Sequence, residues 1–130
     1  QQLPENIQSR LAIENDDIRF NLQDCLYIHQ QINIPIIFDY FHHQVFNSGE
    51  SASDALKAVV TTWNEKTDGI PMLDYASQQP NARKGKHTEH IDLDHFKHFL
   101  QATAGYNLDI MLEIKDKEAS ALKALRLAKN

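Results

Sequence analysis

The chain has 130 residues, of which 42% are hydrophobic and 24% charged, and its net charge is −5 with histidine counted as neutral. The length and composition suit one globular domain with its own core, and the single cysteine, Cys25, excludes an internal disulfide and a zinc finger built on several thiolates. The acidic balance argues against simple binding to nucleic-acid phosphates, unless carboxylates hold divalent cations that reverse the local charge.

No apolar run approaches the roughly 20 residues that cross a bilayer, and the first residues do not resemble a signal peptide. These features predict a cytoplasmic protein with no membrane partner.

Four short apolar segments are each followed by an acidic residue. The segments are residues 10–13, 34–38, 70–73 and 108–112, and the acids are Glu14, Asp39, Asp74 and Glu113. Each segment is too short for an independent helix and too evenly apolar for a strand with one solvated face. This pattern is typical of buried parallel strands.

Helical patterns alternate with these strands. They cover residues 21–32, 51–65, 92–102 and 117–128, with Ser51 or Ser53 and Asp92 as expected N-caps. Residues 47–49 and 78–86 are predicted loops. The alternation predicts an α/β fold with a parallel sheet and right-handed crossovers.

Four strand–helix units are half of a TIM (β/α)8 barrel, which typically needs about 250 residues. We therefore expect residues 1–130 to be a single portion of a longer barrel domain whose other half is missing. A complete open sheet of four strands is the alternative.

The four acids are expected to gather at one rim, because the carboxyl ends of barrel strands face the same side. A single acid after a strand can equally cap a helix, but four carboxylates at one rim would repel one another without cations between them. His42 follows Asp39 by three residues. Carboxylate together with imidazole suits Mn²⁺, Zn²⁺ or Fe²⁺ better than Ca²⁺.

A basic loop precedes His87. Arg83, Lys84 and Lys86 predict contact with an anion such as phosphate, although a loop histidine is more often solvated than a ligand. Lys115 follows Glu113 by two residues and is expected to reach the same rim. The remaining histidines are interpreted as surface or packing residues, and Cys25 as a core residue without a nucleophilic role.

Four blocks of sequence suggest a family. They are residues 10–17 (RLAIENDD), 34–43 (IPIIFDYFHH), 85–87 (GKH) and 109–117 (DIMLEIKDK). Together they resemble the C-terminal half of UV damage endonucleases, over nearly the whole chain. The resemblance implies a TIM-barrel endonuclease of DNA repair that nicks damaged double-stranded DNA on the 5′ side of UV photoproducts and other lesions.

The resemblance also implies a cluster of divalent metal ions, with Mn²⁺ the usual metal and Zn²⁺ or Mg²⁺ as alternatives. The metal ligands that it implies are Glu14, Asp39, His42, His87 and Glu113. Glu14 and Lys115 are the expected catalytic residues, and the expected DNA contacts are Arg83, Lys84, Lys86 and Lys115.

The third strand departs from the family pattern. Met72 and Asp74 stand where family members commonly have a lysine and a ligand histidine, which indicates a divergent subfamily. Asp74 retains an oxygen ligand for a hard cation and is kept among the expected metal ligands. A metal-dependent sugar isomerase or epimerase, and a non-catalytic DNA- or metal-binding relative, remain as alternatives, and the oligomeric state stays open.

Overall fold

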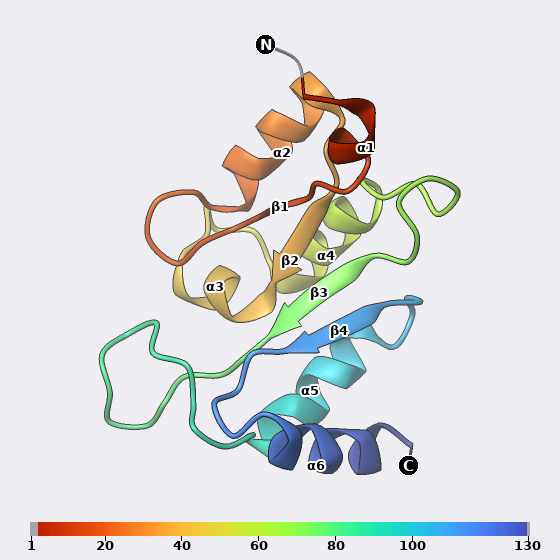
Figure 1. Cartoon of the computed structure of the whole chain (residues 1–130). Coiled ribbons are helices and arrows are strands. Elements are labelled where there is room, and N and C mark those ends of the chain that lie inside the picture. Colours follow the sequence, from red (N-terminus) through yellow and green to blue (C-terminus); the bar gives the residue numbers. More distant parts are fainter. Residues whose placement is uncertain (1–2, 130) are drawn as a thin grey trace.

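The computed structural model describes residues 3–129 as an α/β fold with one parallel sheet (Figure 1). The strands run in the order β1-β2-β3-β4, and all three neighbouring pairs are parallel. Their bounds are β1 (Ile13–Glu14), β2 (Ile36–Asp39), β3 (Met72–Tyr75) and β4 (Asp109–Leu112). The predicted alternation of parallel strands and helices is confirmed, although residues 10–12 lie outside β1.

Four helices occupy the predicted regions: α2 (Leu22–Ile32), α4 (Ala52–Val60), α5 (Leu93–Thr103) and α6 (Glu118–Ala128). Ser51 and Asp92 are N-caps, and the side chain of each accepts a hydrogen bond from a backbone N–H in the first turn of its helix. None of the helices in the described part of the chain is long and apolar enough to span a membrane.

The prediction that the second helix extends to residue 65 is wrong, because α4 ends at Val60. Beyond α4, the side chains of Thr62 and Trp63 form hydrogen bonds with Ile36, the first residue of β2. The Thr62 hydroxyl accepts from the Ile36 N–H at 3.1 Å, and the Trp63 indole donates to the Ile36 carbonyl at 2.7 Å. These bonds tie the end of α4 to the neighbouring strand.

Two short helices were not predicted, α1 (Glu5–Gln8) and α3 (Tyr40–Val45). His42 therefore lies on a helix that directly follows the second strand. Helix α3 begins directly after Asp39 because the carboxylate of Asp39 accepts a hydrogen bond from the His42 N–H at 2.7 Å.

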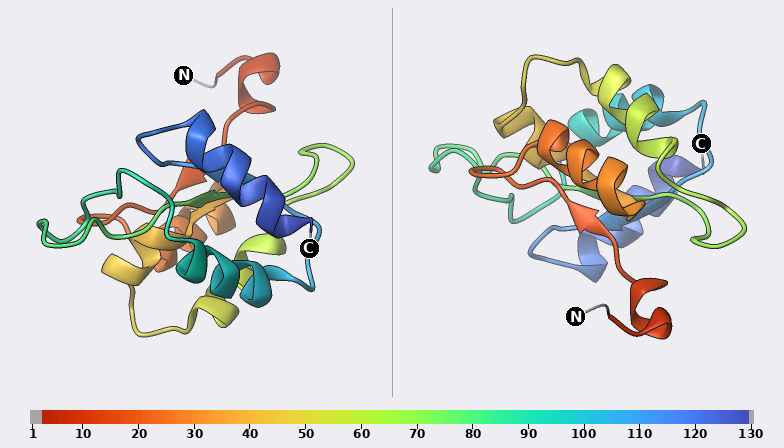
Figure 2. Two further views of the ribbon diagram at one scale, coloured as in Figure 1. Left: turned by 90° about the horizontal axis from the view of Figure 1, so that it is seen from below. Right: turned by 90° about the horizontal axis from the view of Figure 1, so that it is seen from above.

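The two faces of the sheet differ. Side chains on one face are fully buried, including Ile36, Phe38, Leu73 and Tyr75. On the other face, Ile37 and Met72 are half-buried and Met111 is 51% exposed, so β4 is not the fully buried strand that was predicted. In both views of Figure 2, α4 and α5 lie on the opposite side of the sheet from α1. The helices thus cover mainly one face.

Candidate metal centre

The register of the sheet places the four predicted acids on one face. Asp39 is paired with Asp74, and Glu14 is paired with Ile37, two residues before Asp39. Glu113 lies two residues after Met111, the partner of Asp74. Since paired residues point to the same side and side chains alternate along a strand, all four acids share the less covered face.

Asn15 joins the ends of β1 and β2. Its side-chain amide donates to the Asp39 carbonyl, its side-chain oxygen accepts from the Asp39 N–H, and both bonds are 3.0 Å long. Asn15 and Asp39 are both fully buried. A buried polar backbone needs such partners, so Asn15 fixes where Asp39 stands relative to Glu14.

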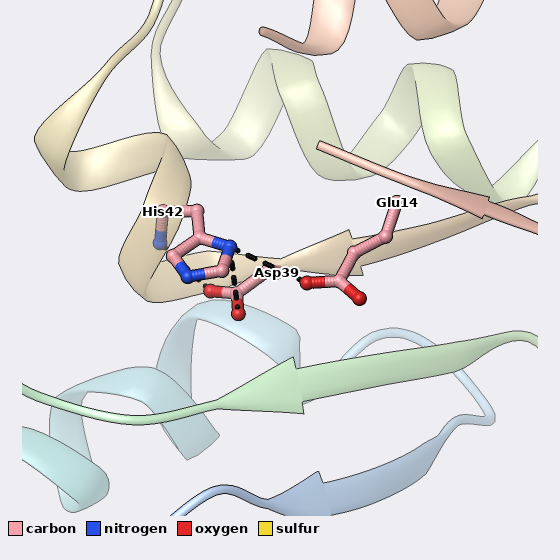
Figure 3. Close-up of side chains that lie close together, drawn as sticks. All are labelled: Glu14, Asp39 and His42. Atoms are coloured by element: carbon pink, nitrogen blue, oxygen red, sulfur yellow. Dashed lines mark hydrogen bonds and ion pairs between the residues drawn. The ribbon is translucent and has the colours of Figure 1, made fainter. Parts of the chain in front are cut away.

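Glu14, Asp39 and His42 form the closest group of potential ligands (Figure 3). The Nδ1 atom of His42 lies 3.1 Å from Oδ2 of Asp39 and 3.3 Å from Oε1 of Glu14. It also lies 3.0 Å from the backbone carbonyl of Asn15. One ligand atom from each of the three residues lies within 4.8 Å of the others, a spacing that allows all three to bind one ion.

The electrostatics of this group reflect burial and crowding. Burial raises the pKa of Asp39 to about 7, and the charges of Glu14 and Asp74 act in the same direction, against the N–H and charge of His42. Burial lowers the pKa of His42, but the hydrogen bond to Glu14 and the charge of Asp39 outweigh it and raise that pKa to about 9.

Oδ2 of Asp39 forms an ion pair with His42, whose Nδ1 lies 3.1 Å away, but it is buried and accepts no hydrogen bond from any residue between 3 and 129. A buried carboxylate oxygen that accepts no hydrogen bond is costly in a folded protein. A cation shared with Glu14 and His42 would satisfy it, so these residues fit a divalent metal.

His87 and Glu113 form a second pair next to this group. Nδ1 of His87 lies 3.1 Å from the backbone carbonyl of Glu113 and 3.6 Å from its Oε2. The rings of His87 and His42 have centroids 5.6 Å apart. The structure thus places His87 and Glu113 beside the three-residue group, without making them part of it.

Asp74 is affected by the charges of both groups, Glu14 and His42 in the first and Glu113 in the second. It is buried, and burial together with the charges of Glu14 and Glu113 raises its pKa to about 6, while His42 opposes the shift. Asp74, which was predicted as a metal ligand, is therefore a buried carboxylate whose pKa is raised by neighbouring acids. Met72 is half-buried on the same face of β3.

A pocket of about 470 Å³ opens beside the histidines. The residues that line it are Asp17, His42, Arg83, Gly85, Lys86, His87 and Lys115. Three of them, Arg83, Lys86 and Lys115, are the predicted DNA contacts, whereas Lys84 is exposed and lies outside the lining. We call this feature the cationic pocket.

Asn15, Asp17 and Gly85 are residues of the site to which the sequence assigned no role. Asn15 and Asp17 are part of the RLAIENDD block, and Gly85 is part of the GKH block. A buried asparagine directly after a strand is a signal for a side chain that binds backbone. The contact between Asp17 and Gly85 joins two distant loops, and no local pattern predicts it.

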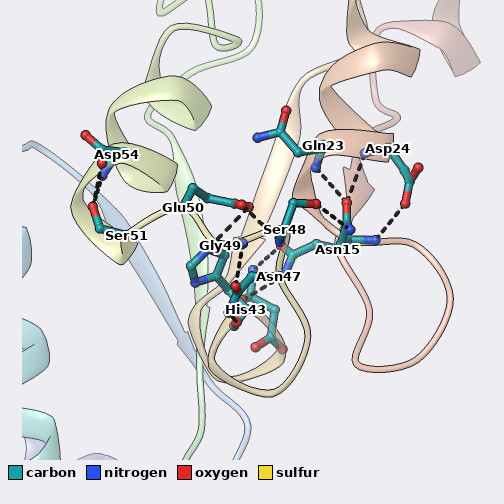
Figure 4. Close-up of polar contacts among 12 residues, drawn as sticks. Asn15, Gln23, Asp24, His43, Asn47, Ser48, Gly49, Glu50, Ser51 and Asp54 are labelled. Atoms are coloured by element: carbon teal, nitrogen blue, oxygen red, sulfur yellow. Dashed lines mark hydrogen bonds and ion pairs between the residues drawn. The ribbon is translucent and has the colours of Figure 1, made fainter.

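His43 points away from the metal group, as expected. It is buried with its ring centroid 5.2 Å from that of Phe38, and its Nε2 atom lies 3.5 Å from Oε1 of Glu50. Figure 4 shows the loop behind it, where Ser48, Gly49 and Glu50 are held by short polar contacts. This loop connects α3 to α4.

His95 is a packing residue, as predicted. Its Nδ1 atom lies 2.8 Å from the hydroxyl of Tyr75, and burial lowers its pKa. Trp63 is half-buried, whereas Phe96, Phe99 and Cys25 are buried, as expected for Cys25. His90 is exposed, with Nδ1 3.0 Å from Oδ2 of Asp116.

Comparison with known proteins matches the whole chain to one family. The family described as UV-endonuclease UvdE matches residues 1–130. The UV DNA damage endonuclease of Clostridium perfringens is 35% identical over 98% of this chain and 31% of its own length. A homologue named UV DNA damage endonuclease in Bacillus cereus strain Q1 is 34% identical over 93% of this chain and 38% of its own.

A solved structure is similar as well. The crystal structure of SacUVDE superposes with a TM-score of 0.91 at 46% sequence identity, over 98% of this chain and 42% of that chain. The chain thus spans about a third to two fifths of the length of these proteins.

Proposed function

The chain belongs to the UV-endonuclease UvdE family, and on this premise we propose that it is part of a metal-dependent DNA repair endonuclease. The protein nicks double-stranded DNA on the 5′ side of UV photoproducts and other lesions, and acts in the cytoplasm. The observation that carries this proposal is the group of Glu14, Asp39 and His42 beside a cationic pocket. Metal ligands next to a cationic pocket suit phosphodiester hydrolysis.

The fold is proposed to be the C-terminal half of a TIM barrel. Consecutive parallel strands in sequential order, separated by helices on one face, are the repeating unit of such a barrel. The other face and the edge strands β1 and β4 would meet the remaining strands, which fits the exposure of Met111 on that face. In this arrangement the acids and the cationic pocket lie at the carboxyl rim.

Glu14, Asp39 and His42 would hold one divalent cation, with Asp74, His87 and Glu113 available to a second. Carboxylate and imidazole donors fit Mn²⁺, with Zn²⁺ or Mg²⁺ as alternatives. When bound, the cations would lower the pKa of a water molecule and neutralise charge on the scissile phosphate.

The cationic pocket would hold the DNA backbone. Arg83, Lys86 and Lys115 bind phosphate oxygens and align the strand with the metal ligands, while exposed Lys84 adds a more distant positive charge. Lys115 lies two residues past Glu113 and stabilises charge on the phosphate. Glu14 is the proposed central residue, because its side chain, at 38% exposure, is open to a substrate.

The test is Glu14→Gln in the full-length protein, assayed on irradiated supercoiled plasmid with Mn²⁺ and with chelator. We expect nicking to be lost by at least a hundredfold while the unfolding temperature stays unchanged, because the replaced side chain is partly exposed. Glu65→Gln is the matched control, since Glu65 is exposed in the turn after α4. Wild-type nicking by Glu14→Gln would exclude this assignment.

A second function, DNA or metal binding without catalysis, is favoured by one observation. Met72 and Asp74 occupy the third strand, so no lysine is present there. Binding of Mn²⁺ to the full-length protein with no nicking on several lesion types would support this alternative.

A further inference from the structure

The loop between β1 and α2 is built around one carboxylate. Oδ1 of Asp16 accepts hydrogen bonds from the N–H groups of Ile18, Arg19 and Phe20, at 2.7, 2.5 and 3.1 Å. The Asp16 N–H in turn donates to the Phe20 carbonyl at 2.8 Å. Four bonds within five residues give the tip of this loop a defined shape.

This defined loop presents apolar side chains to solvent. Ile18 is 70% exposed and Phe20 is 56% exposed, and exposed Arg19 lies between them. Neither side chain is needed to close the loop, since its hydrogen bonds involve only backbone groups and Asp16. Neighbouring apolar side chains held out by a rigid loop mark a contact surface. We call Ile18, Arg19 and Phe20 the apolar tip.

The apolar tip stands at the rim of the cationic pocket. Asp17, the residue before it, lines that pocket, and a side-chain carbon at Gly85 would meet the Asp17 carboxylate. In Figure 1 the loop after β1 and the long loop after β3 both leave the sheet at the edge to which the arrows point. A ligand in the pocket therefore contacts Asp17, and the apolar tip begins at the next residue.

We propose that the apolar tip contacts base faces of the DNA strand whose phosphates occupy the cationic pocket, an inference that rests on the proposed function. Nucleic acid is the ligand that offers both chemistries side by side, with anionic phosphates for the pocket and flat apolar bases for Phe20 and Ile18. Apolar side chains of this kind enter between base steps or stack on unpaired bases. A lesion exposes such a base face, because damage weakens pairing and stacking.

The salt dependence of DNA affinity distinguishes the contact made by the apolar tip from the phosphate contacts made in the cationic pocket. Stacking of Phe20 on a base releases no counterion, whereas each lysine–phosphate contact does. Removing Phe20 should therefore weaken binding equally at all salt concentrations. Removing Lys86 should flatten the dependence of log K on log[salt] by about one unit.

The experiment measures binding of the full-length protein to a fluorescent duplex with one photoproduct, in chelator and over a series of NaCl concentrations. Phe20→Ala is expected to lower affinity roughly tenfold with an unchanged salt slope, and Ile18→Ala to lower it less. Tyr106→Ala is the matched control, because Tyr106 is partly exposed just before β4, at the opposite edge of the sheet. It should bind as the wild type does.

Wild-type affinity in Phe20→Ala would overturn the inference. A lower unfolding temperature or a changed molecular mass of the free variant would also overturn it, since the tip would then be covered by another part of the protein or by a second copy. If Phe20→Ala weakens binding but the wild type nicks no lesion, the proposed function fails and the contact stands. If the wild type nicks and Phe20→Ala binds normally, only the contact fails.

Discussion

Gly85 lies directly against the carboxylate of Asp17, in a backbone conformation with φ of +81°. An added Cβ at position 85 would overlap Oδ2 of Asp17, and the positive φ also disfavours a side chain. The positive φ thus favours glycine at the place where the loop that carries Arg83 and Lys86 meets the loop after β1, and an added side chain would also displace the Asp17 carboxylate. Gly85 and Asp17 both line the cationic pocket.

Gly85→Ala should therefore strain the basic loop and displace the carboxylate of Asp17. We expect the affinity for duplex DNA to fall about tenfold and the stability to fall by about 1 kcal/mol, because alanine is strained at this φ and the Asp17 carboxylate must shift. Fluorescence anisotropy and urea unfolding of the full-length protein measure the two effects. Gly105→Ala is the control, since Gly105 has open space around its Cβ position and no positive φ. Equal behaviour of both variants would contradict the prediction.

Asn15→Ala should destabilise the fold by about 2 kcal/mol, because it leaves the buried N–H and carbonyl of Asp39 without partners. Affinity for Mn²⁺ should fall as well, since Asp39 loses its fixed position relative to Glu14. Urea unfolding and metal titration of the full-length protein measure both. Asn107→Ala, at an exposed position before β4, should change neither, and a similar loss there would argue against a specific role for Asn15.

The stability of the metal-free protein should fall as the pH rises from about 4 to 9. Asp39 has a pKa of about 7 when folded, above its ordinary 3.8, so its protonation stabilises the folded state. This contribution is complete below pH 3.8 and is lost as the pH rises through 7. His42, with its pKa raised to about 9 from 6.5, contributes stability that is complete below 6.5 and is lost as pH rises through 9. Urea unfolding in chelator at several pH values checks this, and a stability that increases over this range would contradict it.

Metal binding should release protons between pH 7 and 9. A metal-bound imidazole or carboxylate must give up its proton, and His42 is protonated at neutral pH when its pKa is about 9. The apparent affinity for Mn²⁺ should therefore increase with pH. Calorimetric titration in buffers of different ionisation enthalpy counts the protons. His98→Ala, on exposed α5 surface, should leave the count unchanged, whereas His42→Ala should reduce it.

Asp74→Asn should stabilise the metal-free protein and weaken its metal binding. The aspartate is buried near Glu14 and Glu113, and those neighbours raise its pKa to about 6, so a neutral amide removes an unfavourable charge. We expect a gain of about 1 kcal/mol at pH 8 and a loss of about tenfold in Mn²⁺ affinity. Unfolding and metal titration of one sample measure both. Lower stability together with unchanged affinity would show that Asp74 has a structural role only.

Local sequence predicted the strands and most of the helices. Each strand is a short apolar run, and Ser51 and Asp92 cap helices through bonds that span three residues, so the information lies close together in the chain. The sequence also predicted that Glu14 and Asp39 lie close together, because parallel strands bring their carboxyl ends to one edge of the sheet. The short helix α3 was missed, since its start depends on one carboxylate that also belongs to the metal group.

Local sequence is therefore enough to predict an acidic residue at the end of each strand. Which of these residues meet depends on the three-dimensional fold: His42 joins Glu14 and Asp39, while His87 and Glu113 lie alongside. The cationic pocket was equally a product of tertiary structure, because it forms where two loops from distant parts of the chain touch. Hydrophobic periodicity is encoded by neighbours in sequence, whereas contacts between loops depend on sheet register and packing, which no local pattern specifies.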